Sequence, residues 1–170
     1  MKIYLQPLGP VDPGVLDDLM QRLSALWEVL LSPPRKLPSN AYNAVRGQFE
    51  GSLLLKSLPD NDIVLGVTEA DAYVEGLNFI FGLASGNKAL ISLQRLRPEF
   101  YGSPQDEELF RLRAFKEAMH ELGHVFGLGH CPYPRCVMHF SNTLMDTDRK
   151  GWRYCKLCAA RLSSQWVLHR

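Results

Sequence analysis

The sequence lacks any run of about 20 apolar residues, the length that a membrane-spanning helix needs. It also lacks an excess of charge of one sign, because its 170 residues carry a formal net charge of +1. That balance gives no reason to expect a nucleic acid or a membrane surface as partner. The N-terminus becomes polar too early for a secretory signal peptide, which favours a cytoplasmic protein. A soluble globular protein remains, and its length predicts one domain over 1–170.

Cysteine and histidine are scarce, with four and five residues respectively, and both are clustered. Three of the five histidines lie in 120–130, and all four cysteines lie in 131–158. In a cytoplasmic protein such cysteines are more often metal ligands or free thiols than disulfides. The sequence therefore places its chemistry in the last third of the chain, with 1–130 as the sheet and active-site helix and 131–170 as a C-terminal subdomain.

One segment reads H-E-x-x-H-x-x-G-x-x-H. His120 and His124 are four residues apart, so both imidazoles lie on one face of a helix and can converge on a zinc ion. Glu121 is placed to act as a general base rather than as a ligand. Gly127 allows the helix to end and the chain to bring His130 back as a third ligand. A bare H-E-x-x-H can arise by chance, but the third histidine and the glycine favour a catalytic zinc with one open position.

The cysteines follow the pattern C-x4-C, a gap, then C-x2-C. Two close pairs with this separation are typical of a closed, structural zinc site made of Cys131, Cys136, Cys155 and Cys158. Two disulfides or free thiols are the alternative. Several basic residues are expected to offset the negative charge of the thiolates: Arg135, Arg149, Lys150, Arg153, Lys156 and Arg161. The run 148–150 is otherwise interpreted as a solvated loop rather than as part of a cleft.

Hydrophobic periodicity predicts five strands, and the fold class is α+β with a mixed, twisted five-stranded sheet. Helices between the early strands make the first three parallel, whereas the turn Gly86-Asn87 predicts an antiparallel pair at the edge. The predicted strands are 3–8, 27–32, 63–68, 78–84 and 89–93, and the predicted helices are 13–26, 41–58, a long active-site helix after 103, and a last helix from 155.

The long helix is predicted to begin at Ser103 as its N-cap, with Pro104 at its first position. Its core-facing stripe is expected to consist of Leu112, Phe115, Met119, Leu122 and Phe126. His120 and His124 fall on a flank of that stripe, which weakens the alternative that they are core histidines.

These residues resemble the metzincin zinc proteases, whose motif is followed by a methionine-containing turn. The appended pattern H-C-x4-C-x-M, then C-x-x-C, is similar to that of the archaemetzincins. The resemblance implies a metzincin-like fold, zinc on the three histidines with Glu121 as base, and a second zinc on the four cysteines. It also implies Met138 as the turn methionine and the strand 78–84 as the edge that pairs with a peptide substrate. Phe140 stands where some metzincins have a tyrosine.

The expected function is that of a zinc metallopeptidase with two zinc ions per chain, either an aminopeptidase or a peptidase of narrow specificity. Its partner is then a peptide or protein substrate, with a monomer favoured. One alternative is a zinc-binding interaction module with little proteolytic turnover. A second is a nucleic-acid-binding tail, against which the counter-charge role of the basic residues argues.

Overall fold

A computed structural model describes residues 1–168, with side chains through Leu162. Its main sheet has the strand order β2-β1-β5-β8-β7, in which only β7 runs antiparallel to its neighbour. The mixed five-stranded sheet and the parallel pairing of its first three strands are therefore confirmed. The strands are β1 (Lys2–Leu8), β2 (Glu28–Leu31), β5 (Ile63–Thr68), β8 (Lys88–Ser92) and β7 (Gly82–Ser85).

Both faces of the sheet are covered. Side chains alternate along each strand, so that Leu65 packs into the core beneath α1 (Pro13–Ser24) and α3 (Glu107–Val125). Its neighbour Val64 packs on the opposite face against α2 (Gly51–Ser57). A small second sheet also exists, made of β3 (Tyr42–Asn43), β4 (Gln48–Glu50) and β6 (Ala72–Tyr73). Short 3-10 turns cover Ser39–Ala41, Gln94–Leu96 and Pro98–Tyr101.

The helix predicted over 41–58 is wrong in its first half. Residues 42–50 form β3 and β4, and Gly47 between them has a φ of +67° that favours glycine. The helix α2 begins only at Gly51, where the Glu50 side chain accepts hydrogen bonds from the backbone N–H groups of Ser52 and Leu53. The apolar residues before and after Gly47 follow the spacing of a single helix, but the turn at Gly47 makes the first stretch a strand pair and only the second a helix.

The predicted edge strand 78–84 is also shorter than expected, because β7 begins at Gly82. Upstream of it, Ile80 forms a single bridge to Ala72 of the small sheet. The carbonyl of Asn78 accepts hydrogen bonds from the Gln48 and Arg46 side chains. The hairpin turn at Gly86-Asn87 is where the sequence predicts it, between β7 and β8.

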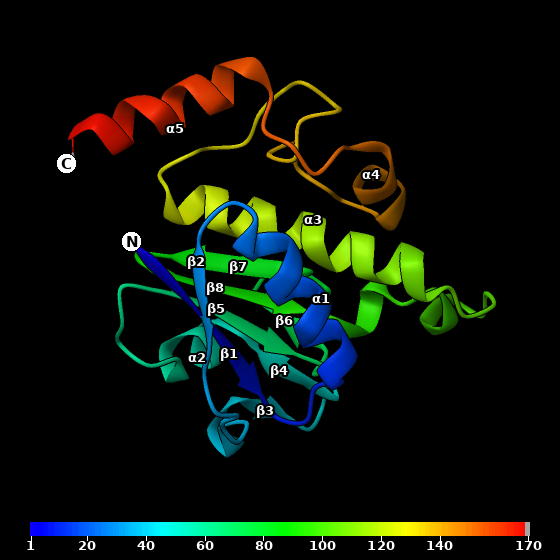
Figure 1. Ribbon diagram of the computed structural model, residues 1–170. Coiled ribbons are helices and arrows are strands. Elements are labelled where there is room, and N and C mark those ends of the chain that lie inside the picture. Colours follow the sequence, from blue (N-terminus) through cyan, green and yellow to red (C-terminus); the bar gives the residue numbers. More distant parts are fainter. Residues whose placement is uncertain (169–170) are drawn as a thin grey trace.

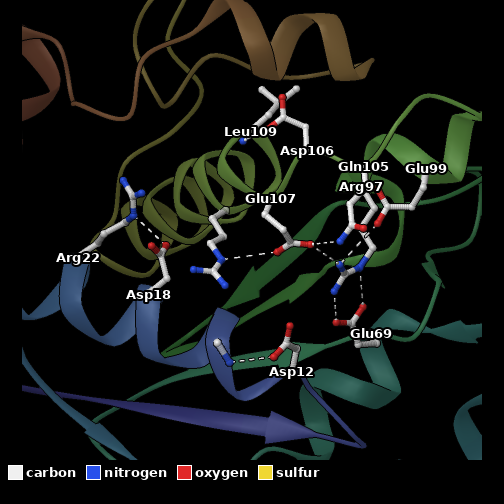
Figure 2. A network of polar contacts seen from close by, with 12 residues as sticks. Asp12, Asp18, Arg22, Glu69, Arg97, Glu99, Gln105, Asp106, Glu107 and Leu109 are labelled. Carbon is white, nitrogen blue, oxygen red and sulfur yellow. Dashed lines mark hydrogen bonds and ion pairs between the residues drawn. The ribbon is translucent and has the colours of Figure 1, made fainter.

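Figure 2 shows the start of α3, which differs from the prediction. The N-cap is Asp106, not Ser103, and its carboxylate accepts a hydrogen bond from the Leu109 N–H at 3.0 Å. Arg97 fixes this end of the helix: its guanidinium bonds Glu69 beyond β5 at 2.6 Å and lies 4.0 Å above the Phe110 ring. The helix that carries His120 is thereby tied to the sheet at its first turn.

Helix α3 lies between the sheet and the C-terminal segment that carries α4 (Leu144–Arg149) and α5 (Lys156–Leu168) (Figure 1). Four of the five predicted stripe residues are buried, whereas Leu112 is only half-buried. The opposite side of the helix is buried too, and it carries the polar residues Arg113, Lys116 and Glu117. Within 1–168 we find no helix with both the length and the apolar character needed to cross a bilayer.

Candidate active site and metal centres

The C-terminal end of α3 brings three histidines together. After Val125 the chain makes a Schellman turn, in which Gly127 N–H bonds His124 O and Leu128 N–H bonds Gly123 O. Gly127 has a φ of +88°, a conformation that suits glycine. The turn directs the chain back, so that the ring nitrogens of His120, His124 and His130 lie within 4.8 Å of one another.

The hydrogen bonds of the first two rings fix which nitrogen is free. His120 Nδ1 lies 2.7 Å from the carbonyl of Val137, and His124 Nδ1 lies 2.8 Å from that of Leu128. A carbonyl only accepts, so both Nδ1 atoms carry the proton and both Nε2 atoms present lone pairs. These two Nε2 atoms face each other at 3.1 Å. Two opposed lone pairs at this distance favour a cation between them, and tetrahedral zinc places its ligand nitrogens about 3.3 Å apart.

The surroundings also keep the first ligand neutral, as metal binding requires. Burial lowers the pKa of His120 to about 3, and the nearby ammonium of Lys150 acts in the same direction. Lys150 Nζ is 3.4 Å from His120 Nδ1, but the proton on that nitrogen already points to Val137, so the contact is one of charge rather than a hydrogen bond. His130 is exposed, with the Phe140 ring 5.0 Å from its own.

Glu121 lies beside this cluster on α3 and is buried. Burial raises the pKa of its carboxyl well above the usual range, and the neighbouring Glu117 contributes in the same sense. The carboxylate packs directly against Gly82 of β7, where an added Cβ would lie 2.5 Å from Glu121 Oε1. The edge strand thus approaches the predicted base closely only because it has glycine at this position.

A cavity of about 550 Å³ opens onto the three histidines and Glu121. One wall is formed by β7 and the residues before it. Phe81 O accepts from Ser92 N–H at 2.9 Å, so alternation along an antiparallel pair leaves the peptide groups of Gly82 and Ala84 on the open edge of the sheet. The arrangement gives an extended peptide a backbone partner beside the histidines.

The four cysteine sulfurs form a second cluster, also within 4.8 Å of one another. All four are free thiols, with Cys131 Sγ and Cys155 Sγ 3.8 Å apart, so the alternative of two disulfides is wrong for this structure. The N–H of Cys158 lowers the pKa of Cys155 to about 7, whereas burial raises that of Cys136. Four thiol groups at this spacing fit a tetrahedral zinc site.

The segment between the clusters touches both. Val137, which orients His120, follows Cys136, and the next residue, Met138, is fully buried against Gly123. At Gly123 an added Cβ would collide with the sulfur of Met138. Tyr154 precedes Cys155, and its hydroxyl donates to the carbonyl of Met119 at 2.7 Å.

Among the cavity residues that sequence reasoning missed are two buried charged ones, Glu117 and Lys150. The run 148–150 was expected to be solvated, but the Lys150 side chain is 0% exposed and lines the cavity. Its ammonium donates to His139 O at 3.2 Å and lies 3.5 Å from Glu117 Oε1. The positive charge of Lys150 therefore lies beside the histidine site and not beside the cysteines, whose charge it was expected to offset. Asp148 instead forms a two-pronged ion pair with Arg113 at 2.7 Å. A lysine in a polar run carries no sequence signal for such burial.

Known proteins match almost the whole chain. The model of peptidase family M54 matches residues 41–164. The archaemetzincin of Methanocaldococcus jannaschii is 50% identical over 98% of this chain and 96% of its own length, and that of Pyrococcus furiosus is 47% identical over 96% and 93%. A crystal structure of the Archaeoglobus fulgidus archaemetzincin with malonate is 41% identical, covers 95% of this chain and 99% of its own, and has a TM-score of 0.87. A zinc-dependent peptidase from Methanocorpusculum labreanum is 30% identical over 94% and 99%, with a TM-score of 0.84.

Proposed function

The chain belongs to peptidase family M54, the archaemetzincins, and is thus a zinc metallopeptidase, and we propose which of its residues bind the zinc and which act in catalysis. His120, His124 and His130 hold the catalytic zinc, and Glu121 is the general base. The observation that carries this proposal is the pair of opposed Nε2 lone pairs at 3.1 Å, with a buried carboxylate beside them and a cavity in front.

A zinc ion held by His120, His124 and His130 would supply the Lewis acidity needed to activate a water and polarise the scissile carbonyl. The residues of the chain orient the substrate and transfer the proton. The open edge of β7, at Gly82 and Ala84, pairs with the substrate backbone and orients the peptide along the cavity. Glu121 accepts the proton of the attacking water and passes it to the leaving amine. Phe140 adds no hydrogen-bond donor, so no tyrosine-like hydroxyl assists at that position.

We propose that the cysteine cluster holds a second zinc with a structural role. All four positions of a tetrahedron are filled by Cys131, Cys136, Cys155 and Cys158, so no site is left for substrate or water. With two clusters the chain holds two zinc ions. Metal analysis by mass spectrometry before and after mild chelation tests this: one zinc should be labile and one resistant, and a single zinc per chain in the fully loaded protein would contradict it.

We propose a single domain that acts as a cytoplasmic monomer on a narrow range of peptides. The cavity of about 550 Å³ accommodates only a few side chains. Trimming of N-terminal residues, as by an aminopeptidase, is the narrower version of the same proposal. Digestion of a peptide library with free and acetylated N-termini separates the two, because only an aminopeptidase requires the free amine.

The substitution Glu121→Gln tests the assigned base. The side chain keeps its shape but cannot accept the proton, so peptide cleavage should fall by roughly 10²–10⁴, the usual contribution of a general base. Zinc content and thermal unfolding should match those of the wild type, which shows that the site is otherwise intact. Full cleavage by this variant would exclude Glu121 as base. Peptide binding without any turnover by the wild-type, zinc-loaded protein would favour the interaction module instead.

A further inference from the structure

The floor of the cavity, one helical turn before His120, is polar. Glu117 projects from α3, and Lys150 reaches it from the end of α4. Their side chains are 4% and 0% exposed, yet both line the cavity, whose lining also includes the apolar residues Phe79, Ile80 and Phe81. Charged groups buried to this extent need partners, so their hydrogen bonds can be counted one by one.

One oxygen of Glu117 is fully used and the other is not. Oε1 accepts from the Thr147 hydroxyl at 3.3 Å and faces Lys150 Nζ at 3.5 Å. Within the described part of the chain, no hydrogen bond reaches Oε2. The same cavity is lined by Ser141, whose buried hydroxyl has no partner among the described residues either. One buried hydroxyl without a partner, that of Ser141, and one carboxylate oxygen that is not sealed off, Glu117 Oε2, thus belong to residues lining the same substrate-sized space.

Charge decides which side chain these groups suit. The ion pair of Glu117 with Lys150 is neutral as a unit, so a basic substrate side chain would enter without a counter-charge of its own. An acidic side chain would likewise enter without a net counter-charge, because Glu117 already offsets the charge of Lys150. An apolar side chain would bury Glu117 Oε2 and the Ser141 hydroxyl without partners, which costs affinity. An uncharged side chain with an N–H donor satisfies Glu117 Oε2, and its carbonyl can accept from Ser141.

We propose that Glu117 and Ser141 are specificity-determining residues, which select a carboxamide side chain (Gln or Asn) at one of the two positions flanking the scissile bond. Lys150 and Thr147 are positioning residues that hold Glu117 in place. This inference rests on the proposed peptidase function for its meaning in catalysis. The binding preference itself can be measured without turnover.

The test uses zinc-loaded Glu121→Gln protein and fluorescent peptides of one sequence that differ at a single flanking residue: Gln, norleucine, Glu or Lys, at each flanking position in turn. Fluorescence anisotropy gives the dissociation constants. At one position Gln should bind at least about tenfold more tightly than norleucine, the effect of one hydrogen bond to a charged group. Glu and Lys should both bind more weakly than Gln. Equal or tighter binding of norleucine at both positions would overturn the proposal.

The double substitution Glu117→Met/Lys150→Met replaces the pair by apolar chains of similar length, an exchange that buried ion pairs often tolerate. In the Glu121→Gln background it should reverse the preference, so that norleucine binds more tightly than Gln. Lys88→Met is the control, because the Lys88 side chain is also largely buried but bonds the carbonyl of Leu58 and the carboxylate of Asp60 and does not line the cavity. Its preference for Gln should stay that of the parent.

Ser141→Ala deletes only a hydroxyl and should lower the preference for Gln severalfold even if the double variant does not fold. An unchanged ratio in Ser141→Ala would remove Ser141 from the proposal, and an unchanged ratio in a folded double variant would remove Glu117. Assays of the wild-type protein distinguish a failure of the peptidase function from a failure of the proposed subsite. Cleavage without side-chain preference would support the peptidase but contradict the subsite, whereas preferential binding without cleavage would do the reverse.

Discussion

The histidine and cysteine clusters lie next to each other in sequence and bring their ligand atoms equally close, within 4.8 Å, yet they differ in their surroundings. The histidine cluster faces a cavity of about 550 Å³, and one of its members, His130, is exposed. The cysteine cluster has two buried and two half-buried thiols and does not line that cavity. An ion in the first can meet a substrate, whereas an ion in the second can only hold the chain.

The second cluster holds the parts of the chain that shape the first. Cys131 follows His130, Cys136 precedes the residue that orients His120, and Cys155 follows Tyr154, which bonds the last turn before His120. Three of the four cysteines are thus one peptide bond from a residue that belongs to the histidine site or contacts it. From this comparison we infer that the cysteine site positions the histidine site, and we expect the dependence to run in that direction only.

The largest expected effect comes from breaking the closed site. Structural zinc sites contribute on the order of 10 kcal/mol to folding, so Cys136→Ser should release its zinc and unfold the segment after His130. Because Val137 then no longer orients His120, the catalytic zinc should be lost as well, and with it peptide cleavage. Zinc per chain, activity and thermal unfolding by circular dichroism measure these losses.

His130→Ala is the matched change in the open site. It should abolish cleavage and weaken one zinc, while the cysteine zinc and the thermal unfolding transition remain close to those of the wild type. Loss of a single zinc in Cys136→Ser, with activity retained, would show that the two sites are independent and would refute the one-way dependence.

A smaller change affects only the open site. Gly82→Ala places a Cβ about 2.5 Å from Glu121 Oε1, and the carboxylate must move. Cleavage should fall by roughly 10²-fold, because misplacing the base forfeits much of its contribution, while both zinc ions stay bound. Gly14→Ala in α1 is the control, since its Cβ approaches closely only the flexible end of Arg111 and lies at an ordinary 3.4 Å from Asp12 Oδ1. If Gly82→Ala retains full activity, the close approach of β7 to Glu121 has no part in catalysis.

Tyr154→Phe tests the link between the sites with a single hydroxyl. Its loss removes the 2.7 Å hydrogen bond that the hydroxyl adds to the Met119 carbonyl and should lower the free energy of unfolding by about 1 kcal/mol. Activity should change by less than about tenfold, because the backbone of α3 still carries His120. Chemical denaturation and peptide kinetics provide the two measurements, and a loss of the cysteine zinc would contradict this limited role.

What the sequence could predict differs between these regions for a physical reason. The histidine and cysteine clusters depend on local spacing and local turns, such as that at Gly127, so their assembly can be read from a short stretch. The neighbours of Glu121 cannot, because Gly82 and Lys150 come from other elements and approach it only after the sheet and the C-terminal segment pack on α3. The boundary errors have a similar origin: apolar residues in 41–58 fit a helix period, but a glycine turn and pairing with β6 make its first half strand.

The smallest effect is expected at the first turn of α3, at the other end of this helix from the histidines. Two residues there suit an N-cap by type, Ser103 and Asp106, but only Asp106 accepts a backbone hydrogen bond, from Leu109 N–H. Asp106→Ala should therefore lower the free energy of unfolding by about 1 kcal/mol, whereas Ser103→Ala should leave it within about 0.5 kcal/mol of the wild type. Neither should alter zinc content or peptide cleavage, since Arg97 still ties the helix start to Glu69. A larger loss in Ser103→Ala would mean that the helix begins three residues earlier in solution, and an activity loss in Asp106→Ala would mean that the position of His120 depends on the far end of its helix as well as on the cysteine cluster.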